Sequence, residues 1–320
     1  MIRQALLAAT ALALSACATT DQMSAATAST AAPSETATSS GPALWRVSDE
    51  DTTIYLFGTV HFLPEGVEWY NPTIRAALES SDEFVSEIDT SAIPEVVPGE
   101  TPPPEVMAIV QTQMRLAQLT TGGTVRDLMT DENRAQYEAA LAGVGVPVAA
   151  LDGFEPWMGM MTLTQMGLVQ AGIDPSTGVE RTLDPLVVDK TRSAFETVEQ
   201  QFGFFDSLPM EAQLAGLDQT VEMMETPEDL RTSFAAMVTE WMEGDAAGLA
   251  ALVNDEMAAD PALYATLISD RNARWAEWLE KRMDRPGTVF VAVGAGHLGG
   301  SGSVQYYLRE RGLTAERVAY

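Results

Sequence analysis

The sequence predicts an α/β fold in which two similar halves form one mixed sheet, with a large helical insertion between them. A Gly-x-x-His motif follows an apolar strand near the start of the chain and again near its end. Helical spacing of apolar residues fills most of the segment between the motifs. Gly58 and Gly294, like His61 and His297, are 236 positions apart, so each half has the order strand, motif, loop, helix, strand.

The elements of the first half follow from local signals. Residues 44–47 and 53–57 are predicted to pair as a hairpin across a polar turn. Asn71 and Pro72 suit the cap and first position of a helix that runs to about residue 81. A strand at 84–88 follows, and the strand–helix–strand order predicts parallel strands.

The rest of the chain is predicted with less detail. The segment from about 105 to 280 is expected to be a helical insertion. In the second half we expect a strand at 288–293, a helix at 303–311 and a final strand at 315–320.

The first 17 residues indicate export. Arg3 precedes a short apolar stretch, as in a signal peptide. Leu-Ser-Ala-Cys follows and resembles a bacterial lipobox, which implies that Cys17 carries a lipid. The alternative is an ordinary cleaved signal with a spare cysteine. We therefore expect a signal peptide at 1–17, a flexible tether at 18–43 and the folded domain at 44–320.

Lipidation implies a place in the cell. Acyl chains on Cys17 would anchor the protein in a membrane. Ala18 follows the cysteine where an aspartate would retain the protein at the inner membrane, so the resemblance implies the outer membrane, facing the periplasm.

The charge of the chain excludes one class of partner. The formal net charge is −28, from 18 Lys and Arg against 46 Asp and Glu. Nucleic-acid binding needs a basic surface, so no nucleic-acid partner is expected. Such acidity favours attraction of cations without predicting a metal site.

The two histidines are the strongest candidates for chemistry. His61 and His297 are the only histidines, and both directly follow strands. Ligands of open α/β sheets bind beyond the carboxyl ends of the strands, so both imidazoles are expected at one edge. We expect the motif glycines to supply the backbone angles of a sharp turn there.

Glu87 is the candidate acid. It lies at the end of the strand after the first motif, which we place beside the strand that leads to His61. Two histidines and a carboxylate are a common ligand set for a divalent metal with an open position for water. Alternatively Glu87 is a general base, or merely one of several exposed acids.

Several motifs together resemble the TraB/GumN family, which is related to the Tiki metalloproteases. The matching segments are 55–61, 85–89, 270–272 and 291–300. The resemblance covers about residues 44–320 and implies a metal-dependent hydrolase fold, peptidase-like, with Mn, Co or Zn as cofactor.

The resemblance also implies roles for individual residues. It implies that His61, Glu87 and His297 form the site, and that Arg271 and Asn272 hold a polarised carbonyl or a ligand carboxylate. Glu180 stands where many relatives have an aspartate, one methylene shorter, so its role stays open between ligand orientation and helix capping.

Three functions remain open on the sequence. The chain is a metallo-hydrolase of peptides or other small envelope substrates, a non-catalytic lipoprotein that binds a ligand, or a metal-binding or haem-handling lipoprotein without turnover. Specificity would lie in the helical insertion.

Overall fold

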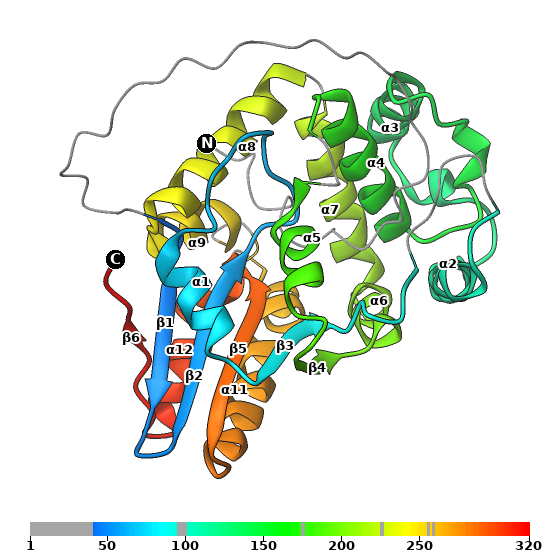
Figure 1. Ribbon diagram of the computed structural model, residues 1–320. Coiled ribbons are helices and arrows are strands. Elements are labelled where there is room, and N and C mark those ends of the chain that lie inside the picture. The colour runs from blue at the N-terminus through cyan, green and yellow to red at the C-terminus, as the bar shows by residue number, and fades with distance from the viewer. Residues whose placement is uncertain (1–40, 95–100, 174–176, 225–226, 255–256, 258–259) are drawn as a thin grey trace, which may run out of the picture.

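A six-stranded mixed sheet organises the chain, with helices on both faces and a group of helices beyond one edge (Figure 1). The computed structural model describes residues 41–94, 101–173, 177–224, 227–254, 257 and 260–320. The predicted signal peptide, Cys17 and all but the last residues of the predicted tether lie outside these ranges.

The sheet has the order β4-β3-β5-β2-β1-β6. Its strands are β1 (Leu44–Ser48), β2 (Thr52–Thr59), β3 (Glu83–Ile88), β4 (Thr191–Glu196), β5 (Gly287–Gly294) and β6 (Glu316–Arg317). Strands β2, β5, β3 and β4 are mutually parallel, whereas β1 pairs antiparallel with β2 and β6. The mixed α/β architecture and the predicted hairpin are therefore confirmed.

Strands β2 and β5 pair along their whole length. Their register runs from Thr52 opposite Gly287 to Thr59 opposite Gly294. Because parallel strands end at the same edge, both Gly-x-x-His motifs leave the sheet side by side. The central expectation of the sequence, that the two halves meet in one sheet, is confirmed.

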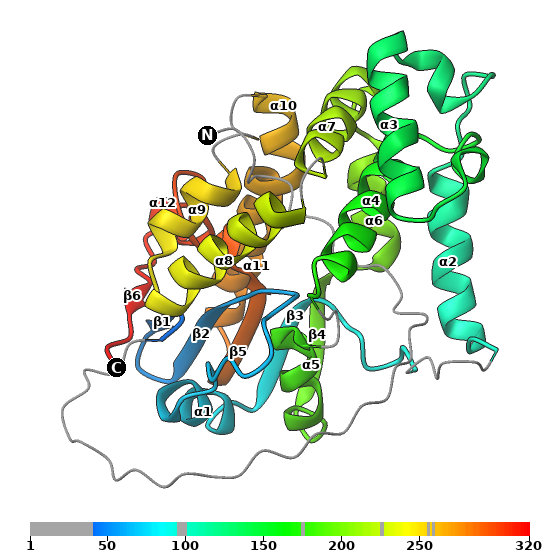
Figure 2. The ribbon, with the colours of Figure 1, turned by 90° about the horizontal axis from the view of Figure 1, so that it is seen from above.

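Each face of the sheet has its own apolar core. On one face, α11 (Asp270–Met283) and α12 (Val304–Glu310) cover the sheet, and Trp275 and Leu279 pack on Val289 and Val291 (Figure 2). On the other face lie α1 (Pro72–Glu79) and α5 (Val179–Leu183). Asn71 caps α1 as predicted, because its side chain accepts hydrogen bonds from two backbone N–H groups.

The remaining helices flank the carboxyl edge and extend beyond β4 (Figure 2). They are α2 (Pro104–Leu116), α3 (Asp131–Gly143), α4 (Pro156–Gln170), α6 (Val198–Asp206), α7 (Met210–Met223), α8 (Pro227–Glu243), α9 (Ala246–Asn254) and α10 (Pro261–Tyr264). Among the described residues, no helix has both the length and the apolarity that a membrane crossing requires.

The structure departs from the sequence prediction at three strands. The segment expected to be a helical insertion contains β4, which joins the sheet beside β3. Strand β3 lies beside β5 and not beside β2, so Glu87 is on the neighbour of the strand that leads to His297. The final strand, expected at 315–320, is reduced to the two residues of β6.

Candidate functional site

The two Gly-x-x-His segments meet at the carboxyl edge of β2 and β5. His61 follows β2 by two residues, and His297 lies in a 3-10 turn (Ala295–Leu298) directly after β5. Neither first glycine has a positive φ, so the expected need for unusual backbone angles is wrong. Their missing side chains matter instead: a Cβ on Gly58 would lie 3.0 Å from Ala295, and one on Gly294 would lie 3.1 Å from Glu87 Oε1.

His61 is held by Glu180. Its Nδ1 lies 2.8 Å from Oε1 of Glu180, so Nδ1 carries a proton and donates it to the carboxylate. Glu180 reaches this position because α5 begins against the first motif, where the N–H of Val179 donates to the carbonyl of Val60 at 3.0 Å. The contact with His61 fits the first of the two roles left open for Glu180, orientation of a ligand. Nε2 of His61 has no partner among the described residues.

His297 is held by Asn272. Its Nδ1 lies 2.6 Å from Oδ1 of Asn272, and its Nε2 lies 3.1 Å from Nη1 of Arg271. An arginine can only donate, so Nε2 is the acceptor and Nδ1 carries the proton of a neutral ring. The amide nitrogen of Asn272 donates to the carbonyls of His297 and Gly302, so every polar atom of this buried side chain is engaged within the protein.

Glu87 lies between His297 and Arg271. Its Oε1 accepts a hydrogen bond from the N–H of Gly294 at 2.7 Å and lies 3.9 Å from Nε2 of His297. Its Oε2 accepts from Arg271 at 2.6 Å and from Gln201 at 2.9 Å. Oε1 is therefore the less engaged oxygen and faces the imidazole.

Arg271 is at the centre of the cluster and uses all of its donors. An arginine has five N–H groups. Here they donate to both oxygens of Glu196, to Oε2 of Glu87, to the carbonyl of Leu267 and to Nε2 of His297. A turn of π-helix (Ala265–Ser269) directly precedes α11, of which Arg271 is the second residue. No N–H of Arg271 remains to hold a substrate carbonyl, and Asn272 has none either; in this arrangement both orient other site residues.

Two residues of the cluster were not predicted, Glu196 and Gln201. Glu196 ends β4, and only 4% of its side chain is exposed. Gln201 lies in the first turns of α6, which begins at a capping box after Glu196. Glu196 is the last residue of β4, and Glu87 is the last but one of β3. If β4 had been predicted as a strand, Glu196 would have been a candidate acid for the same reason as Glu87.

The charges of the cluster shift its pKa values in opposite directions. Burial and the charge of Arg271 lower the pKa of His297 to about 3. Burial also opposes protonation of His61, but Glu180 and then Glu87 outweigh it and raise the pKa of His61 above 6.5. Burial would raise the pKa of Glu87, but Arg271 and the hydrogen bond from Gly294 bring it to about 2.

Comparison with known proteins identifies the family. A sequence model of the TraB/PrgY/gumN family matches residues 43–317. The chain belongs to the TraB/PrgY/gumN family. A protein of Treponema pallidum (strain Nichols), named only as an uncharacterized protein, is 20% identical over 281 residues, which cover 84% of this chain and 80% of that protein. No solved structure matches the chain.

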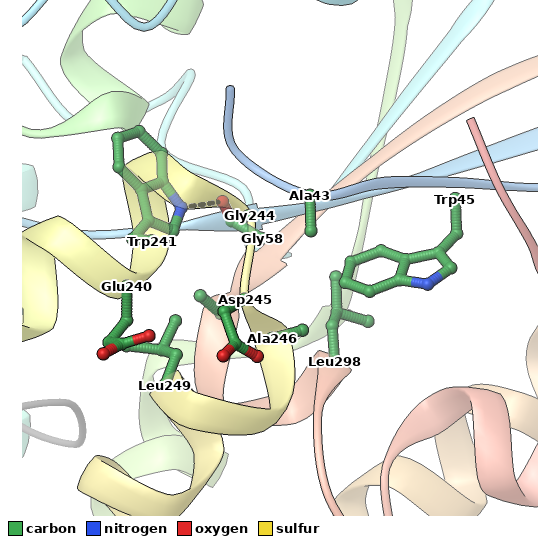
Figure 3. A pocket seen from close by; sticks show the side chains of 11 residues that line it. Ala43, Trp45, Gly58, Glu240, Trp241, Gly244, Asp245, Ala246, Leu249 and Leu298 are labelled. Atoms are coloured by element: carbon green, nitrogen blue, oxygen red, sulfur yellow. Dashed lines mark hydrogen bonds between the residues drawn. The ribbon is translucent and has the colours of Figure 1, made fainter. Parts of the chain in front are cut away.

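A small, mostly apolar pocket lies behind the motifs of this TraB/PrgY/gumN chain. It is lined by Gly58, Ala295 and Leu298 on the motif side and by α8, α9 and the turn between them, which contribute the acids Glu240 and Asp245 (Figure 3). Trp241 of α8 closes it, and the indole N–H donates to the carbonyl of Gly58 at 2.8 Å. This packing fixes the backbone that precedes His61.

The donor set of the TraB/PrgY/gumN chain suits a divalent metal with one adjustment. Each imidazole has its Nδ1 tied to an oxygen, the arrangement usual for histidines that bind metal through Nε2. The cluster contains one guanidinium, which pairs with Glu87 and Glu196, and a third carboxylate, Glu180, which pairs with His61, so it has an excess of negative charge when both imidazoles are neutral. However, Arg271 donates to Nε2 of His297, and no group of three His, Cys, Asp or Glu in the described part of the chain is arranged as a metal site. Metal binding by His297 requires that this one hydrogen bond be given up.

Proposed function

We propose that the protein is a divalent-metal-dependent hydrolase, peptidase-like, that acts on peptides or other small substrates in the cell envelope. One observation supports it above the others: the two motif histidines have their Nδ1 atoms fixed by Glu180 and Asn272, beside a buried carboxylate, Glu87. Family membership is compatible with this activity without assigning it.

The residues that would hold the metal are His61, Glu87 and His297. His61 and His297 would use Nε2, and Glu87 would use Oε1. A metal held there would supply Lewis-acid chemistry: it would lower the pKa of a bound water molecule and would polarise a carbonyl. Mn, Co and Zn all suit this mixed nitrogen and oxygen set.

The surrounding side chains keep these donors ready. Glu180 and Asn272 fix the tautomers of the two rings, so that a lone pair is on Nε2 in each neutral imidazole. The ring of Trp275, 4.5 Å from that of His297, excludes water from that side. Glu87 remains ionised, because its pKa is about 2, and an ionised carboxylate can bind a cation or accept a proton from water.

The test measures metal and turnover on the same samples. The purified protein should contain a divalent metal by elemental analysis and should hydrolyse members of a peptide library in a chelator-sensitive manner. His61→Ala and His297→Ala should each lose the metal while remaining folded. A metal-free wild type that is inactive with every added divalent metal would contradict the proposal.

Glu87→Gln separates the two roles of the carboxylate. If Glu87 is a ligand, which we favour because only two histidines exist, the variant loses metal affinity. If it is the general base, the variant keeps the metal and loses about 10² to 10⁴ in rate. Glu83→Gln is the matched control, because Glu83 is on the same strand but pairs with Arg282 away from the site.

The complete pairing of Arg271 favours a second candidate. Since its five donors are all satisfied by the protein, the cluster is also stable as a binding site without chemistry. Bound metal without turnover would indicate a metal-binding or haem-handling protein. A protein with no bound metal and no turnover would instead be a lipoprotein that binds an organic ligand.

We also propose that the protein is anchored through Cys17 in the outer membrane and faces the periplasm. The support is the Leu-Ser-Ala-Cys sequence, with Ala18 after the only cysteine. This anchor would hold the site near the membrane on a tether of about 25 residues.

A further inference from the structure

We propose that Glu196 is a positioning residue: its carboxylate neutralises and holds Arg271, which sets Arg271 against His297 and leaves the negative charge of Glu87 available to a ligand. The effect on a bound cation rests on the proposed metal function, whereas the placement of Arg271 by Glu196 does not. Glu196 is outside both Gly-x-x-His motifs and outside the four short segments, 55–61, 85–89, 270–272 and 291–300, whose residues match family motifs.

The hydrogen bonds favour Glu196 as the counter-charge of Arg271. Glu196 accepts from Nε at 2.8 Å and from Nη2 at 2.7 Å, the two-point contact that is strongest for a guanidinium and a carboxylate. Glu87 accepts from one N–H of Arg271 only. Glu196 is also the more buried acid, with 4% of its side chain exposed against 18% for Glu87. A buried carboxylate needs a partner of opposite charge more than a less buried one does.

Other contacts fix Glu196 itself. Its Oε1 also accepts from the indole N–H of Trp275 at 3.1 Å, and its Oε2 accepts from Gln201 at 3.1 Å. Phe195, the preceding residue, stacks on Trp275 with ring centroids 5.0 Å apart. Strand β4 and helix α11 are thereby joined at Arg271, whose Nε and Nη2 are held by a fixed carboxylate.

The loss of Glu196 would redirect Arg271. Without its principal counter-charge, the guanidinium would turn toward the remaining carboxylate, Glu87, and take up a two-point contact there. That movement withdraws Nη1 from His297, which frees Nε2 of that ring, and it also neutralises Glu87 as a ligand. The second effect is the larger one for a cation, because a two-point contact with a guanidinium offsets a full negative charge, whereas the bond to His297 is a single hydrogen bond. Glu196 therefore affects a bound cation through Arg271, although it donates no atom to the cation.

The experiment compares Glu196→Gln with Glu83→Gln in the full protein. Each variant removes one carboxylate of the sheet that is paired with a buried arginine of α11. Glu83 pairs with Arg282, away from the site. The first measurement is the ring-nitrogen NMR signals of the metal-free protein, which has only two histidines to assign. The second is the dissociation constant for Mn²⁺, from the electron paramagnetic resonance signal of free Mn²⁺.

In Glu196→Gln, the chemical shift of Nε2 of His297 should move toward that of an imidazole nitrogen that accepts no hydrogen bond. In Glu83→Gln this chemical shift should stay at its wild-type value. The Mn²⁺ dissociation constant should rise at least ~10-fold in the first variant and stay near wild type in the second, as expected for a residue behind the ligands. Glu196→Asp, which keeps the charge, should lie between wild type and Glu196→Gln, and it serves as the test variant if Glu196→Gln does not fold.

An unchanged Nε2 signal in the folded variant would overturn the inference, because Arg271 would then be held without Glu196. Unchanged Mn²⁺ affinity in a protein that binds Mn²⁺ would also overturn it. A wild type that binds no Mn²⁺ contradicts the proposed function instead, and the nitrogen signal alone then decides the role of Glu196.

Discussion

The two histidines should make opposite contributions to the acid stability of the metal-free protein. The pKa of His297 is about 3 in the folded chain against 6.5 for an unperturbed histidine, so the unfolded chain binds this proton first as the pH falls. Stability is then lost between about pH 6.5 and pH 3 at ~1.4 kcal/mol per pH unit. Between pH 7 and pH 4.5 the loss amounts to ~2.5 kcal/mol.

His61 should behave in the reverse sense. Its folded pKa is raised above 6.5 because Glu180 and Glu87 outweigh the effect of burial. The folded chain therefore binds this proton first, and the resulting stability is present at low pH and lost as the pH rises through the folded pKa. The same acidification that weakens the fold through His297 strengthens it through His61.

The assay is the free energy of unfolding by urea, with chelator present, at pH 7 and pH 4.5. The advantage of wild type over His297→Gln should shrink by ~2.5 kcal/mol at the lower pH. The advantage of wild type over His61→Gln should grow. Each variant is the control of the other, because both replace one motif histidine by the same neutral side chain. The assay gives two differences in the free energy of unfolding, wild type minus His297→Gln and wild type minus His61→Gln. If neither difference changed with pH, or if both changed in the same direction, the assignment of charges in the cluster would be refuted.

Three further predictions concern the partner of His61, a glycine packed against His61, and the lipobox cysteine. Glu180→Gln should raise the Mn²⁺ dissociation constant ~10-fold by equilibrium dialysis, because His61 loses its charged partner, and an unchanged constant would remove Glu180 from the site. Gly178→Ala should lower stability by ~1–3 kcal/mol in urea unfolding, since its Cβ would lie 2.2 Å from the carbonyl oxygen of His61. Gly203→Ala, whose Cβ meets nothing within 4 Å, is the control, and equal effects of the two would contradict the packing argument. Cys17→Ser should leave the protein unprocessed or soluble on membrane fractionation, whereas an unchanged lipid-bound product would exclude the lipobox.

The sequence predicted the parts of the fold that have strong local signals. The apolar runs of β2 and β5 and the cap at Asn71 are short-range features, and the structure confirms them. Strand β4 was missed because Thr191–Glu196 is largely polar and lies at the edge of the sheet, so it has neither an apolar run nor clear alternation. The neighbour of β3 was wrong because strand order depends on contacts between distant segments.

The candidate site was predicted only in part for the same physical reason. The strand ends indicated His61, His297 and Glu87, since position after a strand is visible in the sequence. The bond from Arg271 to Glu196 joins residues 75 positions apart, and that from Arg271 to Glu87 joins residues 184 apart. No local pattern encodes such a pairing. The family resemblance left Arg271 two roles, to hold a polarised carbonyl or a ligand carboxylate, and the structure has all five of its donors engaged within the protein, one of them on Glu87.

The repeat of the motif explains how one site obtains two unlike imidazoles. Both histidines occupy the fourth position of Gly-x-x-His after parallel, adjacent strands, so the repeat makes their backbone positions equivalent. Their partners come from unrelated segments: α5 supplies an acid to His61, and α11 supplies an amide and a guanidinium to His297. A carboxylate favours the protonated ring and a guanidinium the neutral one. The two rings therefore differ at Nε2: that of His297 accepts a hydrogen bond from Arg271, whereas that of His61 has no partner among the described residues.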